Sequence, residues 1–271
     1  MDTSSPRKLT VRDLAARRAQ GGKIVALTAY DALMARLADE CGADLLLVGD
    51  SMGMTLLGYK STIPVTLEQS LHHTAAVCRG ARRALVIGDM PFMTYQINPD
   101  EALRNAGRFL QEAGADGVKL EGGRSMAATI GRLVGAGVPV LGHIGLLPQQ
   151  VLADGGYRIR GRTPEEAAAL LEDAVAVEAA GAFGIVLEGI PAALAEQITA
   201  RVSIPTIGIG AGAGCTGQIQ VVYDILGLFE EFVPRHTRRY GALAETIRQA
   251  FTAYAGDVRG GRFPSAAESF Q

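Results

Sequence analysis

The feature that most constrains the fold is a regular alternation of short apolar segments with longer amphipathic segments. The apolar segments have the length of strands buried in a parallel sheet, and helical patterns separate them. The eight expected strands are residues 23–29, 44–49, 84–88, 117–120, 138–142, 184–187, 205–209 and 218–223. This order predicts an α/β fold of the (β/α)₈ TIM-barrel type. An open doubly wound sheet is the alternative, because the pattern alone does not show that the sheet closes.

Capping residues mark four helix starts. An N-cap residue followed three positions later by a side chain that reaches back, or followed at once by proline, is typical of a helix N-terminus. These starts are Thr10 with Asp13, Thr66 with Gln69, Asn98 with Pro99, and Thr163 with Pro164. They predict one helix before the first strand and three helices between strands.

The chain shows no linker rich in proline or serine, so we expect a single domain covering residues 1–271. Its barrel core is expected at about residues 23–227, after an N-terminal helix, and a helical extension at about 228–271. A Gly-Ala pair joins a helix to a strand three times at intervals of about 70 residues. Such recurrence is typical of repeated strand–helix units.

Composition narrows the range of partners. A net charge of −2 and a pI of about 6.1 give no reason to expect nucleic acid or an anionic membrane surface. No apolar run is long enough to span a bilayer, and the N-terminus has no export signal. The three cysteines lie far apart without C-x-x-C spacing, which suits a reducing cytoplasm. We therefore expect a soluble cytoplasmic protein with a small-molecule site.

Four expected strands end in an acidic residue. Asp50, Asp89, Glu121 and Glu188 follow the second, third, fourth and sixth strands. A barrel would bring these ends to one mouth, where the carboxylates would repel one another unless a cation intervenes. Oxygen ligands without cysteine favour Mg²⁺. The alternative for each acid taken singly is that it caps its strand or the next helix.

Lys119, His143 and Ser51 are the other candidate site residues. Alternation along the fourth strand places Lys119 and Glu121 on the same face, toward the barrel interior. Lys119 is then a cation for an anionic substrate, a Schiff-base nucleophile or a structural partner of an acid, and the nearby acids favour the cation. His143 follows the fifth strand and is either a proton shuttle or a packing residue. Ser51 follows Asp50 directly.

Six motifs in this order resemble the ketopantoate hydroxymethyltransferase family, and together they cover nearly the whole chain. They are VGDSMGM at 48–54, DMPFM at 89–93, VKLEGG at 118–123, GHIGL at 142–146, GGY at 155–157 and IGIGAG at 207–212. The chain departs from the family pattern around the eighth strand, at Thr216, Gln220 and Tyr223. The resemblance is therefore weakest for the folate side of the pocket.

The resemblance implies a (β/α)₈ barrel that transfers a one-carbon unit from 5,10-methylenetetrahydrofolate to 3-methyl-2-oxobutanoate, giving 2-dehydropantoate for pantothenate synthesis. It implies a homo-oligomer, often a decamer. It also implies residue roles: Mg²⁺ on Asp50, Asp89 and Glu121, the keto acid on Asp50, Ser51, Asp89 and Lys119, and Glu188 as the catalytic base.

We therefore hypothesise that Glu188 removes the C3 proton of the keto acid while Mg²⁺ stabilises the enolate. Lys119 balances the substrate charge, and His143 assists the transfer. A Mg²⁺-dependent C–C lyase or mutase of the phosphoenolpyruvate mutase and isocitrate lyase type is the rival enzyme, although the chain has no KKCGH-like loop. A Schiff-base aldolase and a catalytically silent binding barrel are further alternatives.

Overall fold

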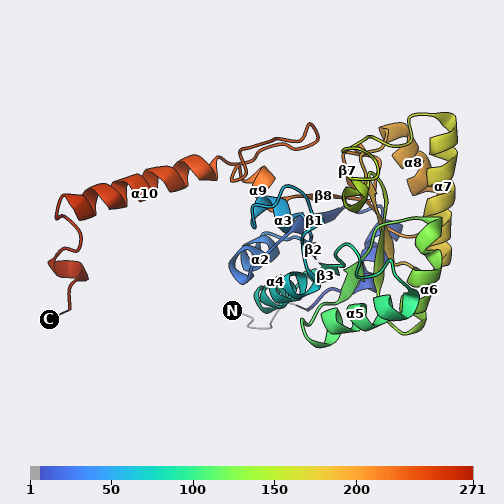
Figure 1. The fold of residues 1–271 in the computed structure, drawn as a ribbon, viewed down its shortest axis with the longest axis horizontal. Helices are drawn as coiled ribbons and strands as arrows, with labels where there is room; N and C mark the ends of the chain where they lie inside the picture. Colours follow the sequence, from blue (N-terminus) through green and yellow to red (C-terminus); the bar gives the residue numbers. More distant parts are fainter. Residues whose placement is uncertain (1–6, 271) are drawn as a thin grey trace. The chain divides into compact units, whose positions relative to one another are not determined.

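Eight parallel strands form a closed barrel in the computed structural model, which describes residues 7–270 (Figure 1). Each strand pairs with its neighbours in the sequence, and β1 pairs with β8 to close the ring. The strands are β1 Ile24–Thr28, β2 Leu45–Val48, β3 Leu85–Asp89, β4 Gly117–Lys119, β5 Val140–Gly145, β6 Gly184–Glu188, β7 Thr206–Ile209 and β8 Gly217–Gln220. The predicted (β/α)₈ barrel is confirmed, and the open sheet is excluded.

Helices between successive strands lie outside the ring (Figure 1). The helices are α1 Val11–Ala19, α2 Ala32–Glu40, α3 Met52–Thr55, α4 Leu67–Gly80, α5 Pro99–Gln111, α6 Ala127–Gly135, α7 Pro164–Ala179, α8 Ala192–Arg201, α9 Val222–Ile225 and α10 Leu243–Arg259. Short 3₁₀ turns are η1 Arg124–Met126, η2 Pro148–Gln150 and η3 Ala266–Glu268. The four predicted helix starts are confirmed at α1, α4, α5 and α7, with Thr10, Thr66, Asn98 and Thr163 as N-caps.

The core has an inner and an outer layer, which explains the continuous apolar run of β2. Leu45 and Leu47 belong to the buried cluster formed by alternate residues of the barrel strands. Leu46 and Val48 belong to a second buried cluster that includes residues of α2 and α4. A strand buried on both faces reads as uninterrupted hydrophobic sequence.

Acidic residues tie together the N-terminal end of the barrel, opposite the mouth. Asp44 is fully buried, and its carboxylate accepts hydrogen bonds from Arg17 at 2.8 Å, Arg83 at 2.9 Å and the Val25 backbone N–H at 3.1 Å. Asp116 accepts the backbone N–H of Val86 in the same way. Two of the recurring Gly-Ala segments therefore end in an aspartate that links its own strand to an earlier strand.

Two predicted strand ends were wrong. β5 extends to Gly145 because it pairs with β6 over its whole length, so His143 lies within the strand rather than after it. β8 ends at Gln220, which is paired with Leu27 near the end of β1. The pairing with β1 ends there, and residues 222–225 form α9 instead of strand.

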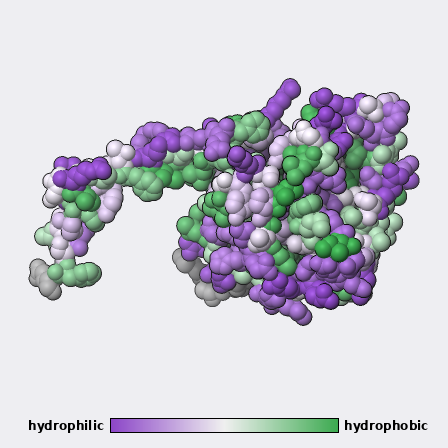
Figure 2. Space-filling view, in the orientation of Figure 1, coloured by the Kyte–Doolittle hydropathy of each residue, from purple (hydrophilic) through white to green (hydrophobic). Residues whose placement is uncertain are grey.

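The chain divides into two compact units, residues 1–221 with the barrel and residues 222–271 with α9 and α10. The single domain with a core at 23–227 stays a prediction. In the second unit, α10 buries none of its residues. Apolar side chains lie along this helix (Figure 2), namely Leu243, Ile247, Phe251, Tyr254 and Val258. Within residues 7–270, no helix is both long enough and apolar enough to cross a membrane.

We predict that Asp44→Asn lowers the free energy of unfolding by about 2–3 kcal/mol, because it weakens charge-assisted hydrogen bonds to a buried carboxylate. Urea unfolding followed by circular dichroism measures this loss. Asp100→Asn is the matched control, since Asp100 is 77% exposed in its ion pair with Arg132 and should cost less than about 1 kcal/mol. Equal effects of the two substitutions would contradict the role given to Asp44.

Candidate active site

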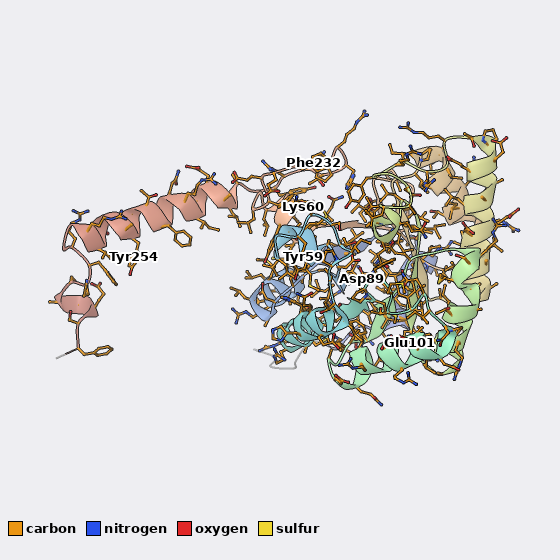
Figure 3. The ribbon with its side chains drawn as sticks, viewed as in Figure 1. Tyr59, Lys60, Asp89, Glu101, Phe232 and Tyr254 are labelled. Atoms are coloured by element: carbon orange, nitrogen blue, oxygen red, sulfur yellow. The ribbon has the colours of Figure 1, made fainter. Side chains whose placement is uncertain are left out.

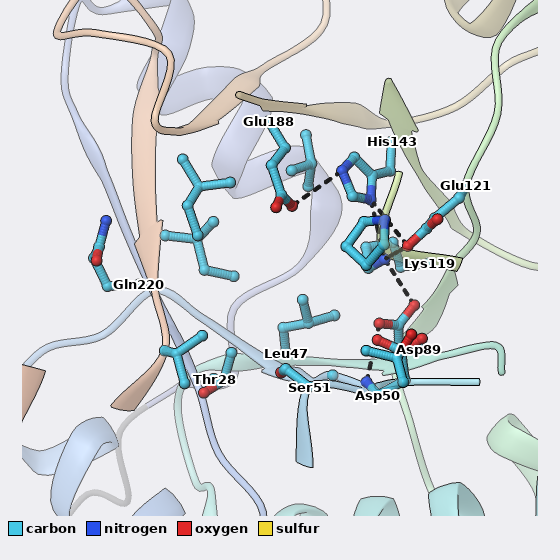
Figure 4. Close-up of a pocket in the computed structure, with 17 residues that line it drawn as sticks. Thr28, Leu47, Asp50, Ser51, Asp89, Lys119, Glu121, His143, Glu188 and Gln220 are labelled. Carbon is cyan, nitrogen blue, oxygen red and sulfur yellow. Dashed lines mark hydrogen bonds and ion pairs between the residues drawn. The ribbon is translucent and has the colours of Figure 1, made fainter. Parts of the chain in front are cut away.

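The carboxyl ends of β2 to β6 bring all of the predicted site residues to one cavity of about 110 Å³ at the barrel mouth (Figure 4). Asp89 lies inside the ring of strands, whereas Glu101 lies on α5 outside it (Figure 3). The predicted residues that line the cavity are Asp50, Ser51, Asp89, Lys119, Glu121, His143 and Glu188. Their convergence follows from the barrel, because His143 lies within the last half of β5 and each of the others is at or just beyond the end of a strand.

Lys119 lies beside Asp89, Glu121 and His143 (Figure 4). It is the register partner of Asp89 on the adjacent strand, and its Nζ atom lies 2.8 Å from Asp89 Oδ1 and 4.0 Å from Glu121 Oε1. Burial alone would lower the pKa of Lys119, but the carboxylates of Asp89 and Glu121 outweigh it and raise the pKa. The side chain is therefore an ammonium ion at neutral pH.

The pKa values of Asp50 and Glu121 are raised in this arrangement. Burial, followed by the charge of Asp89, raises the pKa of Asp50 to about 7. Burial also raises the pKa of Glu121 well above its usual range. Three buried carboxyl groups therefore lie near one ammonium group. A bound cation would supply the positive charge needed to balance the remaining carboxylates.

His143 connects Lys119 to Glu188. Its Nδ1 atom lies 3.3 Å from Lys119 Nζ, and its Nε2 atom lies 3.3 Å from Glu188 Oε2. Burial and the charge of Lys119 lower the pKa of His143, so its ring is neutral. An ammonium group can only donate, so Nδ1 accepts and the ring proton is on Nε2, facing Glu188. Glu188 retains 20% exposure of its side chain at the rim.

Ser51 lines the cavity and is held by a hydrogen bond to Tyr30. Its Oγ atom lies 2.9 Å from the hydroxyl oxygen of Tyr30, which is fully buried and accepts a hydrogen bond from Thr28. Ser51 is also the N-cap residue of α3, directly after Asp50. The hydroxyl therefore reaches the cavity from a fixed backbone position.

Two of the departures from the family pattern, Thr216 and Gln220, lie at opposite ends of β8. Gln220 lines the cavity. Thr216 precedes β8 at the other end of the barrel, where its backbone N–H donates to Thr206 at 3.1 Å. Tyr223 is part of α9 in the second unit. Gln220 is thus a departure from the family pattern that lines the cavity, and the expectation that the resemblance is weakest on the folate side of the pocket stays a prediction.

Sequence reasoning missed two buried residues of the site: Gln149, which contacts the carboxylates of Asp50 and Glu121, and Tyr95, which contacts the Glu121 backbone. The Tyr95 hydroxyl accepts the Glu121 backbone N–H at 3.1 Å, and the Gln149 amide donates to Asp50 Oδ2 at 2.9 Å. Both residues come from loops beyond strand ends, where no periodic pattern marks a side chain as buried. The only available signal was proximity to the DMPFM and GHIGL motifs.

The cavity suits a hard cation held by few protein oxygens. Within residues 7–270, no group of three or more His, Cys, Asp or Glu side chains is already arranged to hold a metal ion. Asp89 Oδ1 is nevertheless buried without a well-aligned hydrogen bond among the described residues, although Lys119 is close. Mg²⁺ typically binds through one or two carboxylates and completes its shell with water and substrate, so the donor set fits it.

The fold and the site are those of an α/β-barrel enzyme, in which the active site lies at the mouth of a parallel barrel. Residues 8–266 match the model of the ketopantoate hydroxymethyltransferase family. The chain is 57% identical over 257 residues, 95% of its length and 91% of its relative's, to the 3-methyl-2-oxobutanoate hydroxymethyltransferase of Chloroflexus aurantiacus. It is 52% identical to the protein of that name from Syntrophus aciditrophicus, over 98% of both chains. The chain therefore belongs to the ketopantoate hydroxymethyltransferase family, whose members are transferases.

Solved structures with the same fold are more distant in sequence. A phosphonopyruvate hydrolase in complex with oxalate and Mg²⁺ has a TM-score of 0.62 at 15% identity, covering 97% of this chain and 92% of that one. A 2,3-dimethylmalate lyase of the PEP mutase/isocitrate lyase superfamily has a TM-score of 0.60 at 18% identity, covering 97% and 93%. At this identity the likeness extends to the fold only.

We predict that borohydride does not trap a small 2-oxo acid such as pyruvate on Lys119, because an ammonium ion paired with Asp89 cannot form a Schiff base. Mass spectrometry of the peptide containing Lys119 makes the measurement, with a known Schiff-base aldolase as the positive control. A reduced adduct on Lys119 would show that the lysine is a nucleophile instead of a fixed cation.

Proposed function

We propose that this protein transfers a hydroxymethyl group from 5,10-methylenetetrahydrofolate to 3-methyl-2-oxobutanoate, giving 2-dehydropantoate. The family match and the names of the relatives support this proposal. The observation that carries it is that one cavity contains every residue to which the family resemblance assigns a role. The three free cysteines are consistent with work in the cytoplasm, where thiols stay reduced.

In this proposal, Asp50, Asp89 and Glu121 hold Mg²⁺, and Asp50, Ser51, Asp89 and Lys119 bind the keto acid. The cation would supply Lewis-acid stabilisation of the negative charge that develops on the keto oxygen. Lys119 provides a second, permanent positive charge for the substrate carboxylate, since Asp89 and Glu121 raise its pKa. The Ser51 hydroxyl orients the same substrate by a hydrogen bond.

Glu188 is the base in this proposal. Its carboxylate lies at the cavity rim, and the Nε2–H of His143 faces it at 3.3 Å. In this proposal the Glu188 carboxylate accepts the C3 proton of the keto acid. The electron pair released at C3 then forms the new bond to the folate-derived methylene carbon. Tetrahydrofolate leaves, and water supplies the hydroxyl oxygen of the product. His143 assists this transfer as a neutral imidazole.

The rival assignment as a C–C lyase or mutase has support only from the fold. The solved structures of that superfamily share the barrel at 18% identity or less. The relatives named as hydroxymethyltransferases share more than half of their residues with this chain over nearly its full length. Dependence on folate is the property that separates the two activities.

Self-association, with a homodecamer as the assembly implied by the family, is the second part of the proposal. α10 is 17 residues long and exposes Ile247 and Phe251 together with Tyr254 and Val258 on one side. An isolated helix of this length is only marginally stable in water, and an apolar stripe is normally covered by another surface. A second copy of the chain is the partner that the family resemblance implies.

We predict that the protein with Mg²⁺ in D₂O exchanges the C3 hydrogen of 3-methyl-2-oxobutanoate, as followed by NMR, and that EDTA stops the exchange. Glu188→Gln should slow it by at least about 100-fold, because the base is lost. Glu101→Gln on α5, outside the barrel, is the control and should exchange normally. Wild-type protein that neither exchanges this hydrogen nor forms a folate-dependent product would sink the proposal.

We also predict that Phe251→Glu on α10 reduces the assembly to smaller species, because a charge in an apolar interface is costly. Light scattering coupled to size-exclusion chromatography gives the mass. Gln249→Glu, on the opposite side of the helix, should leave the mass unchanged. A wild-type protein that runs as a monomer would contradict the proposed self-association.

A further inference from the structure

Gln149 is a buried residue of the site to which the family resemblance assigns no role. It lies in the 3₁₀ turn η2, after β5, and only 3% of it is exposed. Its side-chain amide donates to Asp50 Oδ2 at 2.9 Å and to the Met90 carbonyl at 3.0 Å. Its backbone N–H donates to Glu121 Oε2 at 3.1 Å. One residue therefore contacts two carboxylates that come from different strands.

The orientation of the Gln149 amide is fixed by its neighbours. The Glu121 backbone N–H can only donate, and it donates to the Tyr95 hydroxyl oxygen at 3.1 Å. Tyr95 in turn donates its hydroxyl proton to Gln149 Oε1 at 2.7 Å, and Gln96 Nε2 donates to the same oxygen at 3.2 Å. Oε1 is thus an acceptor, so the –NH₂ group must face Asp50.

The hydrogen bonds from Gln149 occupy one oxygen atom of each of the two carboxylates. Asp50 Oδ2 and Glu121 Oε2 are each held by a donor of Gln149, outside the cavity centre. The second oxygen of each carboxylate is left for the cavity, where Glu121 Oε1 lies 3.6 Å from His143 Nδ1. A donor placed behind a carboxylate fixes its rotation.

We propose that Gln149 is a positioning residue that holds Asp50 and Glu121 in the orientation needed to bind a divalent cation, with Tyr95 fixing the direction of its amide. The inference rests on the proposed function, because that function places the cation on these carboxylates. Residues that orient metal ligands in this way typically change metal affinity by about 10–100-fold when they are removed.

The test measures Mn²⁺ binding to the full-length protein without substrate, from the EPR signal of the free ion. Gln149→Met keeps the length of the side chain and removes the amide, so the Kd for Mn²⁺ should rise about 10–100-fold. Gln150→Met is the matched control, because Gln150 is the exposed neighbour in the same turn, and its Kd should stay within about twofold of wild type. Circular dichroism and the melting temperature of the metal-free proteins check that each variant folds.

Tyr95→Phe is the second variant and removes only the hydroxyl that fixes the amide. It should also raise the Kd for Mn²⁺. This variant tests the hydrogen bond between Tyr95 and Gln149 even if Gln149→Met does not fold. In steady-state assays both variants should raise the Mg²⁺ concentration for half-maximal rate more than they lower kcat at saturating Mg²⁺. If Gln149 had a purely structural role, its loss would lower the melting temperature without raising the Mg²⁺ concentration for half-maximal rate more than it lowers kcat.

Two results overturn the inference: folded Tyr95→Phe or Gln149→Met protein that binds Mn²⁺ within about twofold of wild type, or wild-type protein that binds no Mn²⁺. Failure of the proposed function is seen separately. Wild-type protein that binds Mn²⁺ at the site lined by Gln149, but does not exchange the C3 hydrogen of the keto acid, would refute the hydroxymethyl transfer and leave the role of Gln149 in place.

Discussion

The ion pair between Lys119 and Asp89 is the interaction on which the site depends. It places an ammonium ion among three buried carboxyl groups, with Nζ 2.8 Å from Asp89 and 4.0 Å from Glu121. Without that charge, three carboxyl groups would be buried close together with no ammonium ion to offset their mutual repulsion. Even with it, burial raises the pKa of Asp50 to about 7. The cavity is thus built with a deficit of positive charge, which a substrate-bound cation can fill.

The barrel explains why so much of this arrangement is readable from sequence. Parallel strands that close into a ring deliver their last residues to one mouth, so a carboxylate at each strand end becomes part of one cluster. The alternation in β4 places Lys119 toward the interior, and its register with β3 places it beside Asp89. The strand pattern, the capping residues and the acids were therefore sufficient to predict the fold and the residues that meet.

Loops were less predictable, because their side chains follow no period. Gln149 and Tyr95 reach Asp50 and Glu121 only through the folded path of two loops. The end of β8 was also missed, since the run at 218–223 has strand composition but its pairing with β1 ends at Gln220. Composition indicates what a segment prefers locally, whereas the neighbouring strands decide where it stops.

Asp50 offers the most direct test of the central claim, that the buried carboxylates form a cation site for catalysis. Isothermal titration of Mg²⁺ into folded Asp50→Asn protein, paired with a turnover assay, is the decisive measurement. Loss of Mg²⁺ binding and of turnover, with an unchanged circular dichroism spectrum, is the expected result. A variant that still binds Mg²⁺ and turns over at the wild-type rate would show that Asp50 has only a structural role at the end of β2.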